Sequence, residues 1–200
     1  MKKQMIFVLA LLLGFVMPAL AQNKKVEDRI QLAREKYAER LEHIAVVKEY
    51  EEDEIPAVNY TTIVRKQNWA GSGQMVDKME FYYFEIEEDA EPYPVGYTLV
   101  MMRRTYNIGS TDYFEEYVYD DEGNPLFWFT RYGYAKDDMV ELRGYFAADG
   151  TLVQTICKKA DENGDMKTCG LEEDFNEAFA DAQKHFGQFK KVFHDLYDIE

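Results

Sequence analysis

The sequence predicts an α+β domain in which an antiparallel β-meander sheet is flanked by an N-terminal and a C-terminal amphipathic helix. Three observations predict this class. The centre of the chain is rich in Tyr, Phe, Val, Thr and Ile and is broken by short turns. No helix-length segment separates the strands there, which disfavours a parallel sheet. Both ends of the chain carry apolar residues three and four positions apart, the spacing of one helix face.

The first 21 residues match the pattern of a secretory signal peptide. Lys2 and Lys3 precede an apolar run over residues 5–16, and Ala21 closes a small-x-small cleavage site just before Gln22. The run is shorter than the roughly 20 residues that a bilayer-spanning helix needs. A retained membrane anchor is therefore the less favoured alternative, and we predict cleavage between Ala21 and Gln22.

Residues 1–21 would then be the signal peptide and residues 22–200 a single mature domain. No cysteine lies near the cleavage site, so a lipid-modified N-terminus is not expected, and no later segment could span a membrane. The predicted location is periplasmic or secreted. The chain has 38 acidic and 23 basic residues and a formal net charge of −15, which argues against nucleic acid as a partner because phosphate binding needs clustered cations.

Cys157 and Cys169 are the two cysteines of the chain, and we predict that they form an intrachain disulfide. Exported proteins keep such bonds. Residues 162–164 (Glu-Asn-Gly) fit a three-residue hairpin loop with glycine in the left-handed conformation. Asp161 would then face Asp165, and counting outward places the two cysteines directly opposite each other, within disulfide reach. Free thiols, or bonds to other chains, are the alternatives.

A first helix is predicted over residues 24–50. Its apolar positions recur at steps of three and four with charged residues between them. These positions are Val26, Ile30, Ala33, Tyr37, Leu41 and Ile44. The acidic run 51–54 and Pro56 end the pattern.

The sheet is predicted over residues 57–169. Short connections indicate that consecutive strands are antiparallel neighbours. The expected strands are Val58–Gln67, Met75–Glu87, Tyr97–Tyr106, Tyr113–Asp120, Leu126–Tyr134, Met139–Phe146 and Leu152–Lys158.

A second helix is predicted over residues 171–199. Its apolar residues step alternately by four and three and form one seam. The seam consists of Phe175, Phe179, Ala182, Phe186, Phe189, Phe193 and Leu196. We favour packing of this seam on the sheet. The alternative is self-association through the helix, which would make the protein an oligomer.

One short pattern recurs inside the sheet region. Residues 119–123 (Tyr-Asp-Asp-Glu-Gly) resemble residues 146–150, and the cysteine hairpin is a degenerate third version. Because the glycines are unevenly spaced, this indicates repeated use of one hairpin turn and not a repeat protein. Together with Arg143-Gly144-Tyr145-Phe146 and the Tyr-rich sheet, the chain resembles small exported helix–meander–helix proteins of Bacteroidetes-type bacteria. The resemblance implies an envelope location and brings neither an activity nor site residues.

The turns also predict which side chains share a face of the sheet. Counting outward from the glycine loops, Phe146 faces Leu152, Leu142 faces Ile156, Val118 faces Leu126 and Glu116 faces Trp128. These positions would form one mostly apolar face that suits both helices. The opposite, half-solvated face would hold Tyr113, Glu115, Tyr117, Phe127, Phe129, Arg131, Glu141, Arg143 and Tyr145.

The sequence offers little catalytic chemistry. The three histidines lie on the predicted helices, and neither serine of the mature chain has a nucleophile-elbow pattern. We therefore assign no catalytic residue and expect neither a metal nor a cofactor. Glu115 and Glu141 could project from one sheet face, which leaves a small envelope hydrolase as an alternative. A cross-strand salt-bridge ladder is the simpler interpretation of that pair.

The aromatic and charged face of the sheet is the predicted functional surface. Tyrosine and tryptophan combine a flat apolar body with a polar edge, which suits protein and carbohydrate contacts. The leading hypothesis is an exported, non-enzymatic binding module for an envelope protein or glycan. An oligomerising structural protein is a further alternative. The predicted binding residues are Tyr113, Tyr117, Phe127, Phe129, Arg131, Arg143 and Trp69.

Overall fold

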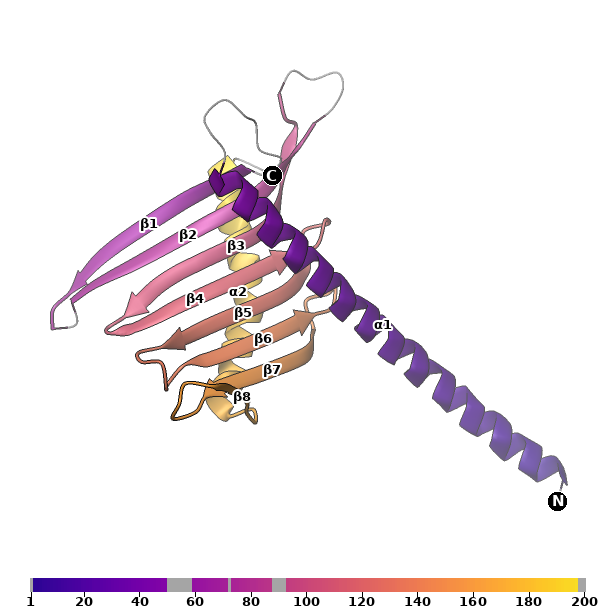
Figure 1. Ribbon diagram of the computed structural model, residues 1–200. Coiled ribbons are helices and arrows are strands. Elements are labelled where there is room, and N and C mark those ends of the chain that lie inside the picture. The colour runs from indigo at the N-terminus through magenta and orange to yellow at the C-terminus, as the bar shows by residue number, and fades with distance from the viewer. Residues whose placement is uncertain (1, 50–58, 72, 88–92, 198–200) are drawn as a thin grey trace.

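The computed structural model of the protein describes residues 2–49, 59–71, 73–87 and 93–197. In this part the chain runs from a helix through a β-meander to a second helix (Figure 1). The elements are α1 (Lys2–Glu49), β1 (Asn59–Trp69), β2 (Gly73–Ile86), β3 (Gly96–Ile108), β4 (Thr111–Tyr119), β5 (Pro125–Gly133), β6 (Val140–Phe146), β7 (Leu152–Ala160), β8 (Met166–Thr168) and α2 (Glu173–Tyr197).

The strands form one eight-stranded sheet in the order β1-β2-β3-β4-β5-β6-β7-β8, and every neighbouring pair is antiparallel. This confirms the predicted fold class. The predicted strands are present with shifts of a few residues at their ends, although Val58 lies outside the described residues. The short strand β8 was not predicted as a separate element. It is the return arm of the cysteine hairpin.

Three hairpins of the meander use the same turn, as predicted. In each, the backbone N–H of the first residue donates to the carbonyl oxygen four residues later. The N–H of the glycine three residues later donates to the carbonyl oxygen of the first residue. The pairs are Asp120–Asn124 (3.0 Å), Ala147–Thr151 (2.8 Å) and Asp161–Asp165 (3.0 Å). The glycines have φ values of 75°, 80° and 82°, which a residue with a Cβ atom rarely adopts. The last of these turns aligns Cys157 with Cys169 at a Cα–Cα distance of 5.4 Å, and the predicted disulfide is formed.

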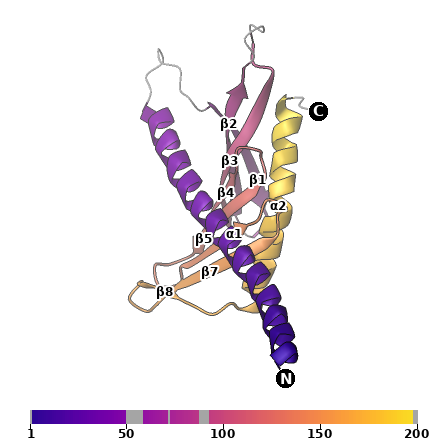
Figure 2. The ribbon, with the colours of Figure 1, turned by 90° about the vertical axis from the view of Figure 1, so that its right-hand side faces the viewer.

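The two helices lie on opposite faces of the sheet, and here the sequence-based expectation was wrong. Figure 2 shows the sheet between α1 and α2. One core packs beneath α2 and contains Tyr117, Trp128 and Phe146. A second core packs beneath α1 and contains Val118 and Phe127. The half-solvated aromatic face that we expected therefore does not exist as one surface, because each face carries its own helix.

The error in the predicted faces comes from β-bulges. The pairing register shifts between Val118 and Tyr119, and again between Tyr145 and Phe146. A shift of one residue moves every following side chain to the other face. Phe146 does pair with Leu152 as expected. Beyond the bulges, however, Leu142 pairs with Cys157, Val118 with Phe127 and Glu116 with Phe129.

Helix α2 buries its phenylalanine seam against the sheet. Phe175, Phe179, Ala182, Phe186, Phe189 and Phe193 are buried, whereas Leu196 is exposed. Phe186 contacts the rings of Tyr117, Tyr119 and Phe146. The favoured interpretation of the seam is thus confirmed. Since the sheet covers these rings, self-association of α2 would have to use other residues.

Helix α1 packs on the other face through its C-terminal half. Ala33 and Ile44 are buried, and Ile30, Tyr37 and Leu41 pack beside them, as their spacing predicted. The helix continues without a break back to Lys2, so Ala21 and Gln22 lie in it, and its N-terminal half extends beyond the sheet (Figure 1). In the part of the chain that the structure describes, no helix has the length and apolar character needed to cross a membrane.

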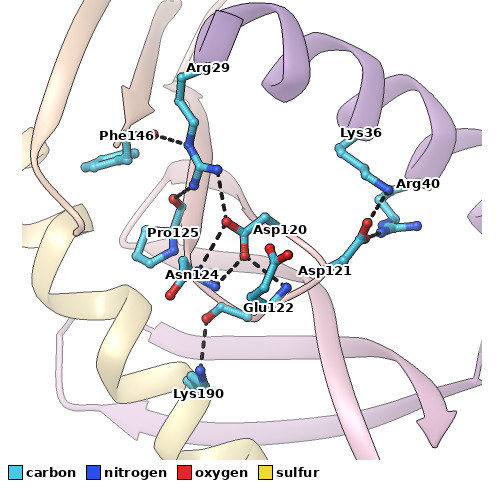
Figure 3. A network of polar contacts seen from close by, with 11 residues as sticks. Arg29, Lys36, Arg40, Asp120, Asp121, Glu122, Asn124, Pro125, Phe146 and Lys190 are labelled. Atoms are coloured by element: carbon cyan, nitrogen blue, oxygen red, sulfur yellow. Dashed lines mark hydrogen bonds and ion pairs between the residues drawn. The ribbon is translucent and has the colours of Figure 1, made fainter. Parts of the chain in front are cut away.

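The turn between β4 and β5 joins both helices to the sheet (Figure 3). Arg29 of α1 pairs with Asp120 at 2.9 Å and also donates to the carbonyl oxygens of Phe146 and Pro125. From the opposite side, Lys190 of α2 donates to the carbonyl of Gly123 at 2.9 Å. One turn therefore fixes the positions of α1 and α2 at the same end of the sheet.

Candidate functional site

A cavity of about 280 Å³ lies between the sheet and α2. Strands β3, β4 and β5 supply one wall, and residues 178–185 of α2 supply the other. Ligand pockets of proteins are typically about 300–1,000 Å³, so this cavity suits a small ligand. Its lining residues are Tyr106, Tyr113, Glu115, Tyr117, Trp128, Thr130, Tyr132, Ala178, Asp181, Ala182 and His185.

Glu115 is the buried acid of this cavity, with 7% of its surface exposed. Burial raises the pKa of its carboxyl group, and Arg104 opposes that shift. The carboxylate lies 3.4 and 3.3 Å from the hydroxyl oxygens of Tyr106 and Tyr117, and its nearest guanidinium nitrogen, on Arg104, is 3.7 Å away. All three contacts are long for hydrogen bonds to a charged group. The carboxylate therefore keeps capacity for a closer donor.

Tyr117 links Glu115 to α2. Its hydroxyl lies 3.1 Å from Nδ1 of His185 as well as 3.3 Å from Glu115. A hydroxyl has a single proton to donate, so it donates either to the carboxylate or to the imidazole. Burial and Arg104 lower the pKa of His185 below its usual value, which favours the neutral imidazole. The pKa of Tyr117 is raised well above its usual value by burial and by Glu115, which keeps the hydroxyl protonated.

The ring of Trp128 lines the cavity, and its indole nitrogen is buried beneath the cavity surface. Its indole ring is buried, and its Nε1–H has no hydrogen-bond partner among the described residues. Buried polar groups in native proteins are nearly always paired, and a buried unpaired group costs about 1–3 kcal/mol. Because Nε1 is closed to solvent, the cavity exposes the ring of Trp128 and not its N–H.

Three tyrosine rings form a stacked ladder across neighbouring strands at the cavity. The ring centroids of Tyr106 and Tyr113 are 4.7 Å apart with an interplanar angle of 6°, and those of Tyr113 and Tyr132 are 5.3 Å apart. Arg104 lies over the Tyr106 ring at 4.2 Å and is itself held by Asp77 at 2.8 Å. Arg104 therefore orders the Tyr106 end of the ladder. Because the rings stack on one another, their inner faces are occupied, and the ladder lines the cavity with ring edges and hydroxyls.

The structure divides the predicted binding residues between the two faces. Tyr113 and Tyr117 line the cavity beneath α2. Phe127, Phe129 and Arg143 instead line a separate groove beneath α1. Arg131 is exposed on β5 and pairs in register with Glu141. Trp69 is the last residue of β1, and its side chain lies outside what the structure describes.

The carboxylate pair suggested for a hydrolase is not formed. Glu115 lies beneath α2, where it pairs in register with Thr130, which in turn pairs with Leu142. Glu141 is one residue earlier in β6 and so projects from the opposite face, where its carboxylate lies 3.3 Å from Arg143. The sheet itself separates the two carboxylates.

Several residues of the cavity were not predicted as site residues. Tyr106 and Tyr132 were assigned only to strands, Trp128 to the apolar face that the helices would cover, and His185 to a helix. The order Tyr-x-Glu-x-Tyr at residues 113–117 places Tyr113, Glu115 and Tyr117 on one strand face, and that alternation was the available signal. The approach of His185 depends on how α2 docks, which no local pattern encodes.

No group of three His, Cys, Asp or Glu residues that could hold a metal ion occurs within the described ranges. Comparison of the chain with protein-family models, with curated proteins and with solved structures gives no match.

Proposed function

We propose that the protein is an exported, non-enzymatic binding module that holds a small polyhydroxylated ligand, a saccharide unit of an envelope glycan, in the cavity beneath α2. The observation that carries this proposal is the unused hydrogen-bonding capacity of the cavity. Glu115 can accept a hydrogen bond from a ligand hydroxyl, and the hydroxyl of the partly exposed Tyr113 can donate to a ligand oxygen. Hydroxyls both donate and accept, so one sugar ring could satisfy both groups.

The tyrosine ladder supports the same ligand class. Tyrosine rings combine apolar edges with a hydroxyl that can donate to or accept from a sugar hydroxyl. Tyr113 and Tyr132 are only partly buried, so part of the tyrosine ladder is accessible from solvent.

Export to the envelope rests on two features of the chain. The leader of residues 1–21 has the charge and apolar pattern of a signal peptide. The disulfide between Cys157 and Cys169 is the kind of bond that persists in oxidising compartments. A glycan-binding role is consistent with such a location.

A glycoside hydrolase is the second candidate, and it now rests on a different carboxylate pair. Glu115 and Asp181 both line the cavity. Burial raises the pKa of Glu115, whereas Lys184 lowers the pKa of Asp181. Two carboxyl groups whose pKa values are shifted apart are typical of an acid and its partner in glycosidases. Asp181 is mostly exposed, and its carboxylate lies 2.9 Å from the ammonium group of Lys184. The protein therefore confines Asp181 less than the buried Glu115, so binding remains the favoured function.

A saccharide panel tests the proposal. Neutral mono- and disaccharides would be screened by saturation-transfer NMR and calorimetry against the wild type, Tyr113→Phe and Glu115→Gln. We expect at least one sugar to bind, and each variant to weaken that binding about tenfold through loss of one hydrogen bond. Tyr60→Phe, on the distant edge strand β1, is the matched control and should bind as the wild type does.

Two outcomes would contradict the binding proposal. One is that no sugar binds the folded wild-type protein. The other is that Tyr113→Phe and Glu115→Gln bind with unchanged affinity. Nitrophenyl glycosides of the bound sugar separate the two candidates, because a hydrolase that uses Glu115 and Asp181 would release nitrophenol and a binding module would not.

A further inference from the structure

A second hollow lies on the opposite face of the sheet, beneath α1. It has a volume of about 330 Å³ and shares no residue with the cavity beneath α2. Helix α1 contributes Ala33, Arg34 and Tyr37. Strands β5, β6 and β7 contribute Phe127, Phe129, Arg143, Tyr145 and Ile156.

The floor of this groove is apolar and closely packed. Phe127 and Tyr145 are buried with their ring centroids 5.1 Å apart. Tyr37 covers Phe127 at 5.0 Å, and its hydroxyl is already used because it donates to Glu116 at 2.5 Å. Ile156 and Phe129 extend the same surface. This floor would stabilise a bound hydrocarbon chain through burial of apolar area.

The rim of the groove is cationic. The Arg143 side chain is 35% exposed, and its ion pair with Glu141 is 3.3 Å long. The Arg143 guanidinium lies over the Phe129 ring at 5.6 Å, so it is held beside the apolar floor. Arg34 is exposed on α1 and has no hydrogen bond or ion pair to any residue that the structure describes. Two guanidinium groups therefore border one apolar groove.

The nearest buried acid does not cancel this charge. Glu116 is paired with Arg103 at 2.8 Å and also accepts from Tyr37, so its charge is balanced within the protein. The chain as a whole has a formal charge of −15. Screening limits that field to about 8 Å at physiological ionic strength. Within this distance Glu141 partly balances Arg143, whereas Arg34 has no ion pair to a described residue.

We propose that the groove beneath α1 binds a single-chain anionic amphiphile, a fatty-acid carboxylate, taken up as a free monomer. The carboxylate lies between Arg34 and Arg143, where a guanidinium can donate two parallel hydrogen bonds to it. The alkyl chain lies on Phe127, Phe129 and Ile156. The volume is near the lower end of the usual range for ligand pockets, which suits one chain of medium length and not a two-chain lipid. This site is independent of the saccharide cavity.

Calorimetry with decanoate below its micellar concentration tests the proposal at pH 7.5. The variants are Arg143→Gln, Arg34→Gln and the double variant, with Lys66→Gln on β1 as the matched loss of one exposed cation. Decanoate should bind the wild type. Each single variant should bind decanoate about tenfold more weakly, and the double variant at least 30-fold more weakly. Decanol and decyltrimethylammonium should bind at least tenfold more weakly than decanoate. Lys66→Gln should bind decanoate as the wild type does.

A methyl NMR titration of the wild type locates the ligand without any variant. Decanoate should shift the δ1 methyl signal of Ile156, which lines the groove. The δ1 methyl signal of Ile63, which packs beneath α2, should not change. The proposal is overturned by equal binding of decyltrimethylammonium, by a double variant that binds decanoate as tightly as the wild type, or by an unmoved Ile156 signal. Association with anionic vesicles in the absence of monomer binding would identify a membrane-contact surface and would likewise overturn it.

Discussion

The guanidinium of Arg29 lies 2.9 Å from the carboxylate of Asp120, which follows β4 directly and is almost completely buried (Figure 3). Asp120 also accepts from the backbone N–H groups of Glu122 and Asn124, at 3.2 and 2.7 Å. The same side chain therefore closes the β4–β5 turn and anchors α1. Because it is buried, its charge depends on Arg29 for compensation.

Replacing Arg29 by methionine should destabilise the protein by about 3 kcal/mol, because removal of one partner leaves a buried charge uncompensated. Urea denaturation of the mature protein measures this loss. Lys36→Met is the control: Lys36 pairs with the exposed Asp121, and surface pairs contribute about 0–1 kcal/mol. Equal losses in the two variants would show that Asp120 does not depend on Arg29.

The disulfide should contribute about 2–3 kcal/mol, since it closes a loop with a sequence separation of 12 residues. The double variant Cys157→Ser/Cys169→Ser should lose this amount in the same denaturation experiment. Mass spectrometry of non-reduced digests should find the two cysteines joined. Free, alkylatable thiols in the exported protein would contradict the assignment.

Phe186 should tolerate no charge. Its side chain is 1% exposed and lies against three aromatic rings, so Phe186→Asp would bury an unpaired carboxylate and should prevent folding. Phe186→Ala keeps the site apolar and should cost about 3–5 kcal/mol through lost contacts and a cavity. Gln188→Asp, on the exposed side of α2, should leave thermal stability nearly unchanged. Wild-type stability in Phe186→Asp would mean that the seam is not buried.

The stability of the protein should depend on pH through His185. Burial and Arg104 lower the pKa of the folded-state imidazole below 6.5, so the folded protein disfavours the charged form. This contribution to stability is complete above pH 6.5 and is lost as the pH falls through the folded-state pKa. His185→Asn should therefore lose less stability than the wild type between pH 7.5 and pH 5.5. NMR titration of the His185 ring checks the direction of the shift, and a pKa above 6.5 would contradict it.

The leader should be removed on export, which leaves Gln22 as the first residue. Intact-mass analysis of the protein secreted from a Gram-negative host would detect this, and Ala21→Arg should block it because the cleavage site requires a small residue. Ala21→Ser conserves the small side chain and should be processed normally. Recovery of the uncut chain from the wild-type gene would contradict the signal-peptide assignment.

Local patterns identified most of the elements of this fold. The turn chemistry of Gly123, Gly150 and Gly164 predicted three of the hairpins, because a left-handed backbone at those positions depends on the residue itself. The cysteine alignment followed from the last of these turns. The helical spacing of Phe175–Phe193 predicted the buried face of α2, because a helix keeps a fixed period over its whole length.

The faces of the sheet could not be predicted in the same way. A strand has a period of two, so one extra residue reverses the assignment of every side chain that follows. The bulges after Val118 and Tyr145 have no marker in the sequence that we recognised. For this reason the prediction that the binding residues share one surface was wrong. Tyr113 and Tyr117 face α2, whereas Phe127, Phe129 and Arg143 face α1.

By itself, the sequence determined the order of the elements, the hairpin turns, the cysteine pairing and the apolar side of each helix, because each depends on residues close together in the chain. Only the tertiary structure decided which sheet face each helix covers. That decision brings His185 to Tyr117 and Arg34 to Arg143, pairs that are 68 and 109 residues apart in the sequence. Contacts over such separations depend on the register of several strands at once, and a single bulge is enough to change them.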